Sequence, residues 1–183
     1  DALVADGHKW LCAPEGAGLL YLDEEFQRRL DPALVGWHSV TERYEFEEPI
    51  FNLRSDAAVV EMGSQNTIGL TGLGVSLSIL LDVGLKRIYD EITTLRNEFT
   101  DQLLERGFRC RHRSWPEDNR SAIVALNHPD LPEDGLVDSF EDQGVQLTRR
   151  GDNLRVGLHF YNNREDVSRL LELLDDVVRR NSR

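Results

Sequence analysis

Lysine and cysteine are scarce in this sequence of 183 residues, since Lys9 and Lys86 are the only lysines and Cys12 and Cys110 the only cysteines. The cysteines lie far apart and lack the spacing of a metal site, so we expect two buried, reduced thiols and no bound metal. No apolar run approaches the roughly 20 residues that a membrane span requires. These scarcities argue against a disulfide-stabilised secreted domain and a membrane protein, and they favour a cytoplasmic one.

Positive charge is also in short supply. The sequence holds 33 acidic and 21 basic residues, a formal net charge of -12. Nucleic acids and anionic membranes are polyanions, so we expect neither as a partner. A starting methionine and a signal-peptide pattern are missing, and the sequence opens directly on an apolar run. We therefore expect a piece of a longer polypeptide.

The most informative stretch that is present holds one lysine between two apolar runs. Residues 2–5 and 16–22 are predicted to be buried strands, and Asp6-Gly7-His8-Lys9 follows the first of them. A lysine at the end of a buried strand, beside a histidine and small apolar residues, lies in surroundings that favour a neutral, nucleophilic amine. Such an amine forms Schiff bases. The alternative is a surface lysine in a loop.

A segment without a clear period follows at residues 34–40 and contains Trp37 and His38. It is typical of a folded loop that lines a pocket. The alternative places Trp37 in the core and His38 on the surface. Residues 42–49 are rich in glutamate and are predicted to be a solvated excursion.

Two long helical patterns occupy the middle of the chain. Residues 67–81 are apolar on most sides and predict a buried helix, which begins between Ser64 and Thr67. The free N–H groups at such a helix start suit a phosphate, although Ser and Asn are also ordinary N-cap residues. Residues 85–105 predict a long amphipathic helix that ends before Gly107.

The last part of the sequence alternates between strand and helix patterns. Strands are predicted at residues 108–112, 121–126, 145–148 and 154–158, and helices at residues 136–143 and 166–179. That order predicts a compact α+β sandwich in which helices cover one face of a mostly antiparallel sheet. We place the domain boundary near residue 85.

Arg155 lies inside the apolar strand predicted at residues 154–158. An unpaired cation there is costly, so we expect a carboxylate partner from the protein or from a ligand. Alone, an arginine in this position is more often part of a structural ion pair. Together with Lys9, it suggests chemistry on an amino acid.

Three segments, in this order, resemble the C-terminal half of a class V aminotransferase: residues 6–18, 61–66 and 154–162. This family is the fold-type I pyridoxal-phosphate group that includes cysteine desulfurases and isopenicillin N epimerase-like enzymes. The resemblance implies an α/β and α+β fold. Residues 1–84 would be the C-terminal portion of the large cofactor-binding α/β domain, and residues 85–183 the small α+β domain.

The resemblance also implies pyridoxal 5'-phosphate as cofactor, an amino acid as substrate and a homodimer. Lys9 would form the internal aldimine and move protons between substrate and cofactor. His8 would contact the cofactor phosphate, and Ser64 would donate its hydroxyl to the phosphate across the dimer interface. Arg155 would clamp the substrate α-carboxylate.

The sequence departs from the family pattern at two places. Asp6 stands where many relatives have a serine that helps to hold the phosphate, and a carboxylate facing a phosphate is repulsive. Residues 145–153 contain no cysteine, whereas cysteine desulfurases carry their nucleophile in that loop. Transamination, epimerisation or elimination is therefore favoured over sulfur transfer.

The family residues that stack on the cofactor ring, pair with its nitrogen and form the main phosphate turn lie upstream of the lysine, before this chain begins. Two alternatives follow. The chain could belong to a cysteine desulfurase relative that uses another thiol, or it could be an inactive piece that serves only as a dimerisation module.

Overall fold

The computed structural model describes residues 1–48 and 50–182. They divide into two compact units, Asp1–Val83 and Gly84–Arg183. Each unit has its own sheet, of two strands in the first and four in the second. The predicted excursion at residues 42–49 is exposed from Tyr44 to Glu48, as expected, and Pro49 lies outside the described residues.

The first unit consists of a hairpin, short helical turns and one long helix. Strand β1 (Ala2–Asp6) pairs antiparallel with β2 (Gly18–Leu22). Helix α1 (Glu24–Arg29) follows, and the 3₁₀ turns η1 (Trp37–Ser39) and η2 (Ala57–Val60) precede the long helix α2. Helix α2 spans Thr67–Val83.

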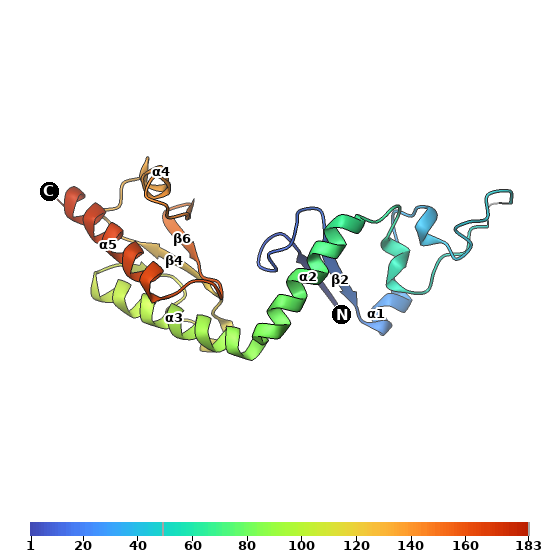
Figure 1. Ribbon diagram of the computed structural model, residues 1–183, viewed down its shortest axis with the longest axis horizontal. Helices are drawn as coiled ribbons and strands as arrows, with labels where there is room; N and C mark the ends of the chain where they lie inside the picture. The colour runs from blue at the N-terminus through green and yellow to red at the C-terminus, as the bar shows by residue number, and fades with distance from the viewer. Residues whose placement is uncertain (49, 183) are drawn as a thin grey trace. The chain divides into compact units, whose positions relative to one another are not determined.

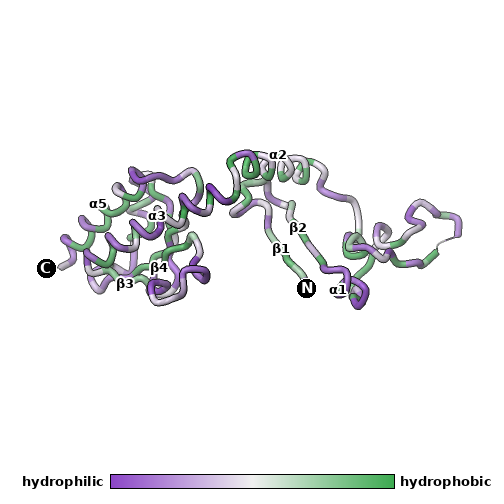
Figure 2. The backbone as a smooth tube through the Cα atoms, turned by 90° about the horizontal axis from the view of Figure 1, so that it is seen from below, coloured by the Kyte–Doolittle hydropathy of each residue, from purple (hydrophilic) through white to green (hydrophobic). Residues whose placement is uncertain are grey.

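Both faces of the hairpin expose apolar side chains. Val4 is 76% exposed on one face and Tyr21 is 62% exposed on the other. Helix α2 likewise exposes Ile68, by 86%, and Figure 2 shows the hydrophobic colouring along β1, β2 and α2. The predicted element types are confirmed, but the prediction that they are buried was wrong. An apolar pattern predicts which face of a strand or helix avoids water, but it does not predict which other segment packs on that face.

The second unit is a four-stranded antiparallel sheet with helices on one face. Its strand order is β3 (Arg109–Cys110), β4 (Ile123–Asn127), β6 (Asn153–Gly157) and β5 (Thr148–Arg150). Helices α3 (Leu85–Glu105) and α5 (Arg164–Asn181) lie side by side along the sheet, as Figure 1 shows. Helix α4 (Leu136–Glu141) and the 3₁₀ turn η3 (Glu117–Asn119) lie in the connections. The predicted α+β arrangement is confirmed for this unit.

The core of the second unit forms between the helices and the inner face of the sheet. Alternate residues of the two central strands point inward, and Val124, Leu126 and Leu154 are at most 1% exposed. Phe99 on α3 and Leu174 on α5 are fully buried against this layer. The intervening residues of these strands therefore lie on the opposite face of the sheet, which we call the outer face.

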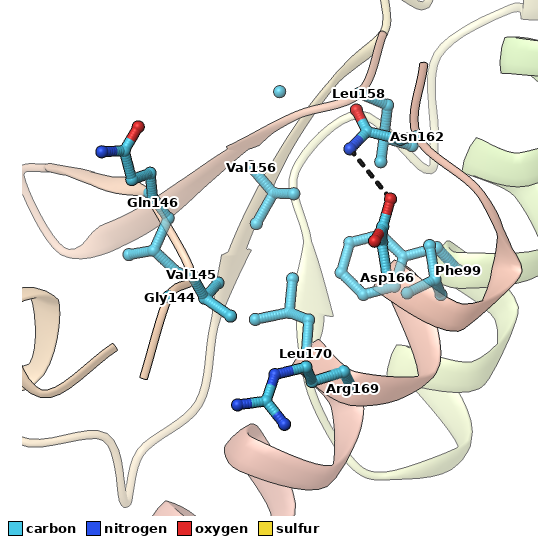
Figure 3. Close-up of a pocket in the computed structure, with 13 residues that line it drawn as sticks. Phe99, Gly144, Val145, Gln146, Val156, Leu158, Asn162, Asp166, Arg169 and Leu170 are labelled. Atoms are coloured by element: carbon cyan, nitrogen blue, oxygen red, sulfur yellow. Dashed lines mark hydrogen bonds between the residues drawn. The ribbon is translucent and has the colours of Figure 1, made fainter. Parts of the chain in front are cut away.

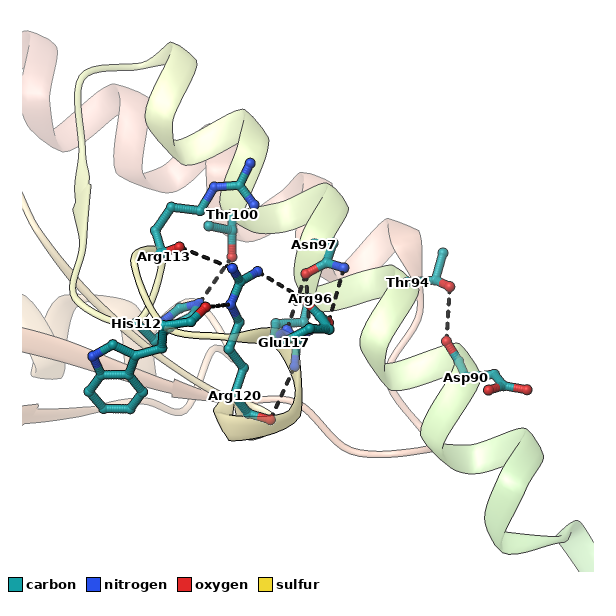
Figure 4. Close-up of polar contacts among 10 residues, drawn as sticks. Asp90, Thr94, Arg96, Asn97, Thr100, His112, Arg113, Glu117 and Arg120 are labelled. Atoms are coloured by element: carbon teal, nitrogen blue, oxygen red, sulfur yellow. Dashed lines mark hydrogen bonds and ion pairs between the residues drawn. The ribbon is translucent and has the colours of Figure 1, made fainter.

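A polar cluster fastens the segment after β3 to helix α3 (Figure 4). The guanidinium of Arg96, which is 2% exposed, forms an ion pair with Glu117 and donates to the carbonyl oxygen of Arg120 at 3.3 Å. His112 is 5% exposed, and its Nε2 lies 3.4 Å from Thr100 Oγ1. Its Nδ1 has no hydrogen-bond partner within the described residues.

His112 makes the stability of this unit depend on pH. Burial, and then the charges of Arg96, Arg120 and Arg113, lower the pKa of His112, and Glu117 only partly offsets them. The unfolded chain therefore binds the proton first, so stability is complete above the unfolded pKa of about 6.5 and declines as pH falls through the folded value. We expect a lower urea midpoint at pH 5.5 than at pH 7.5, measured from the NMR resonances of β4.

The control for this prediction is His112→Gln, which cannot take up a proton and should flatten the pH dependence between these two values. The pKa of Glu117 is lowered, because Arg96, Asn97 and Arg120 together outweigh its desolvation. Its titration therefore falls below this window. An unchanged pH dependence in His112→Gln would contradict the assignment to His112.

Candidate functional site

The turn that carries Lys9, residues 7–17, is closed at its base by backbone hydrogen bonds. The Gly7 N–H donates to the Ala17 carbonyl, and the Ala13 N–H donates to the Gly7 carbonyl, both at 2.9 Å. A Cβ atom at Gly7 would lie 2.7 Å from the Ala17 oxygen, so no larger residue fits without a shift of the backbone. The base of this turn, which we call the Lys9 turn, is therefore fixed.

Hydrogen bonds join helix α2 and its N-cap to the Lys9 turn. The Asn66 side chain caps α2 by accepting from the Gly69 N–H at 3.0 Å, and its amide donates to the Gly16 carbonyl, also at 3.0 Å. Ser76, which lies on α2, donates its hydroxyl hydrogen to the Leu11 carbonyl. The Lys9 turn and the turn before α2 are thus joined through one side chain, that of Asn66.

Lys9 itself is exposed. Its side chain is 69% exposed and forms an ion pair with Asp6, the last residue of β1. The hydrogen bond from Lys9, and then its charge, lower the pKa of Asp6. Within the described residues Lys9 lies in an exposed turn beyond the strand, which agrees with the alternative of a surface lysine in a loop. The carboxylate of Asp6 contacts this amine, which accounts for an acidic residue at this place.

His8 and Ser64 are both exposed. The predicted start of the helix is confirmed at Thr67, and Asn66 provides the N-cap, in agreement with the alternative of an ordinary cap residue at this turn. The contact of Ser64 with a phosphate stays a prediction. Sequence reasoning gave Asn66 no contact with the Lys9 turn, although asparagine is among the preferred N-cap residues and its amide NH2 can still donate when its oxygen accepts the cap bond.

The loop that contains Trp37 lies against the turn before α2. A Cβ atom at Gly36 would overlap the Met62 carbonyl, and one at Gly63 would lie 3.8 Å from Trp37 Nε1. Trp37 is 44% exposed and meets the His38 ring edge-on, with 4.2 Å between the ring centroids. The alternative that Trp37 is a core residue was therefore wrong. The indole of Trp37 is partly exposed to solvent beside the turn that precedes α2.

Arg155 lies in the second unit, on the outer face of the sheet. It is exposed, it stands opposite Ala125 of β4 and Thr148 of β5, and it forms no ion pair with any described residue. The expected protein carboxylate partner is therefore missing from the described part of the chain, because strand alternation turns Arg155 away from the core. It lines a surface pocket of about 310 Å³ together with Thr148 and Glu141. Its guanidinium is free to bind a ligand.

A second hollow, of about 190 Å³, lies between α5 and residues 144–147 (Figure 3). Its polar lining includes Asn162, which donates to the Asp166 carboxylate at 3.2 Å. Asp166 also accepts from the Asn163 N–H in the capping box of α5. The Asn162 amide and the Asp166 carboxylate thus stabilise the N-terminus of α5. Among the described residues that line this hollow, none is a predicted site residue.

The two thiols have different surroundings. Cys110 is buried as expected, and burial raises the pKa of its thiol to about 11, which makes it a poor nucleophile. Cys12 lies exposed in the Lys9 turn, so the expectation that it is buried was wrong.

The described part of the chain contains no group of three His, Cys, Asp or Glu side chains that could hold a metal ion. In the same residues no single helix has the length and apolar character needed to cross a membrane; only α2 and α3 together, separated by a bend, reach that length and apolar character.

Comparison with known proteins places the chain in a family. The model of the class V aminotransferase family matches residues 1–170. A probable cysteine desulfurase of Pyrococcus abyssi is 26% identical, over 98% of this chain and 47% of its own length. The chain thus spans about half the length of the curated relatives that it matches.

Solved structures show the same mixed α/β fold. The apo structure of a cysteine desulfurase from Thermococcus onnurineus NA1 matches with a TM-score of 0.84 and 23% identity, over 98% of this chain and 47% of that one. A C-DES mutant with glycine covalently linked to its PLP cofactor matches with a TM-score of 0.83 and 23% identity, over 93% and 44%. Because the family model covers most of its residues, this chain belongs to the class V aminotransferase family.

Proposed function

We propose that this chain is the C-terminal part of an enzyme that uses pyridoxal phosphate to act on an amino acid. Lys9 binds the cofactor aldehyde, and Arg155 binds the substrate carboxylate. The observation that carries the proposal is the Lys9 turn, a rigid base that presents one accessible amine. Residues 1–84 then belong to the cofactor domain and residues 85–183 to the small domain of a cytoplasmic homodimer.

The groups on the first unit fit this cofactor chemically. An aldehyde requires an accessible primary amine, and Lys9 provides one. A phosphate requires hydrogen-bond donors, and His8 and Ser64 are exposed on the two turns that Asn66 joins. When it is bound, the pyridine ring of the cofactor supplies an electron sink.

The residues of this chain have distinct roles in the reaction. Asp6 holds the Lys9 ammonium by its ion pair and so orients the amine. Once this ammonium has lost a proton to solvent, the neutral Lys9 Nζ takes a proton from the substrate carbon and returns it. Arg155 fixes the carboxylate with two parallel N–H groups, which orients the carbon that exchanges its proton.

Transamination, epimerisation and elimination all agree with these roles. Sulfur transfer is the second candidate, because the relatives that match include cysteine desulfurases. Of the two thiols, only Cys12 has the exposure that sulfur transfer requires, since Cys110 is buried. The third candidate is an inactive dimerisation module.

The full-length protein loaded with cofactor separates these candidates. It is incubated with L-cysteine and, separately, with other L-amino acids, and the products are analysed. Release of a keto acid, formation of the D-isomer or loss of a side-chain group supports the main proposal and identifies the reaction. Conversion of cysteine to alanine with a persulfide supports sulfur transfer. Absence of any turnover would refute both enzymatic functions.

We expect Arg155→Lys in the full-length protein to weaken amino-acid binding by at least about tenfold while cofactor affinity stays unchanged. Lysine keeps the charge but is a point donor, so it loses the two-bond fork. Titration of the loaded protein with substrate and titration of the cofactor-free protein with cofactor, both followed by the absorbance of the cofactor, measure the two affinities. Arg180→Lys, the same exchange at an exposed arginine near the end of α5, is the matched control. An equal loss of both affinities would show that Arg155 is structural.

A further inference from the structure

The outer face of the second unit's sheet concentrates positive charge. Its charged residues are four exposed arginines, which we call the outer arginine face: Arg109, Arg111, Arg150 and Arg155. None of the four forms an ion pair with a described residue, and strands β3 to β6 contain no Asp or Glu. This concentration is unexpected in a chain with a net charge of -12.

The strand register brings two of these arginines close together. Thr148 stands opposite Arg155, and Arg150 lies two residues further along β5, opposite Asn153. Arg150 and Arg155 are thus diagonal neighbours on one face, with about 7–8 Å between their backbones. Their long side chains can reach the two ends of one small ligand.

Arg111 flanks Arg155 on the opposite side. Its N–H donates to the Ala125 carbonyl at 3.1 Å, and Ala125 stands opposite Arg155. Two strand spacings, about 10 Å, therefore separate Arg111 from Arg155. Like charges on neighbouring strands repel each other, and an anionic ligand relieves that repulsion.

One carboxylate lies in the pocket that contains Arg155. Glu141, on α4, lines the pocket that contains Arg155, but it forms no ion pair with that arginine or with any other described residue. Arg150 does not line this pocket. Four unpaired guanidinium groups outnumber this carboxylate and that of the exposed Asp152 in the β5–β6 turn, so the face is cationic.

We propose that Arg150 and Arg155 together bind a dianion, so that the substrate is an amino acid with a second carboxylate on its side chain. Arg155 takes the α-carboxylate, as in the proposed function on which this inference rests, and Arg150 takes the side-chain carboxylate. Each contact is a charge-assisted hydrogen bond, and the pair selects acidic over neutral amino acids.

The test uses the 183-residue chain and two ligands of similar length, glutarate as dianion and butyrate as monoanion. Binding is measured by NMR titration of the arginine Nε–H and Thr148 amide resonances at constant ionic strength. We expect glutarate to bind at least about tenfold more tightly than butyrate. Arg150→Gln should reduce glutarate affinity to that of butyrate, and Arg155→Gln should weaken both ligands.

The matched control is Arg180→Gln, which removes the same charge from an exposed position on α5 and should change neither affinity. If glutarate gains nothing over butyrate, or if Arg150→Gln has no effect, the dianion site is overturned. In that case the role of Arg155 still stands, provided that butyrate binding depends on Arg155. Binding that ignores Arg155→Gln, or no binding of either ligand, defeats the carboxylate role of Arg155 and the dianion site with it.

Discussion

Lys9→Arg in the full-length protein is expected to lower kcat by about 10²- to 10⁴-fold and to abolish covalent capture of the cofactor. A guanidinium stays protonated at neutral pH, so it can neither attack an aldehyde nor take a proton from the substrate carbon. It still pairs with Asp6, so the Lys9 turn keeps its shape. Loss of activity would then report the chemistry of the amine rather than the folding of the turn.

The measurement combines turnover assays with borohydride reduction of the cofactor-loaded protein and peptide mapping. Label is expected on the peptide that contains Lys9. Lys86→Arg is the matched control, because Lys86 is 87% exposed and pairs with Asp90 at 2.6 Å within α3. Label on Lys86, or full activity in Lys9→Arg, would refute the role assigned to Lys9.

Phe99→Ala is expected to destabilise the second unit by about 3–5 kcal/mol. Phe99 is fully buried, and the substitution leaves a cavity between α3 and the inner face of the sheet. Domains of this size are stable by only about 5–15 kcal/mol, so a large part of the stability is lost. Urea unfolding followed by the NMR resonances of β4 and β6 measures the change.

Tyr89→Ala is the control, because Tyr89 lies on the same helix and is 54% exposed. Its effect should stay within about 0.5 kcal/mol. A similar destabilisation by the two substitutions would mean that the burial of Phe99 does not account for its effect on the stability of the second unit.

The sequence was most informative where a pattern and its partner lie in the same unit. The bounds of α3 follow from apolar spacing alone, because this helix packs on a sheet that the same unit supplies. The order of strands and helices after Gly107 was also predictable. The bounds of β5 were not, because the strand predicted at residues 145–148 spans Thr148–Arg150, and the Val145 N–H bonds instead to the Phe140 carbonyl near the end of α4.

The candidate site was less predictable, and for a different reason. Lys9 is exposed because no other described segment covers it, and the local sequence does not reveal whether a segment does so. The role of Asn66 depends on a contact with Gly16, 50 positions away in sequence. The outer arginine face arises only from register, because Arg111 and Arg155 lie far apart in the sequence and within two strand spacings in the sheet.

The outer arginine face also affects how fast an anion reaches it. At long range an anionic ligand meets a chain of net charge -12 and is repelled, whereas at contact it meets unpaired guanidinium groups. At 0.1 M salt the Debye length is about 10 Å, so added salt screens the distant repulsion more than the final contacts. The association rate of a dianion should therefore rise with the first additions of salt and fall only at higher concentrations, the reverse of the usual steady decline for oppositely charged partners.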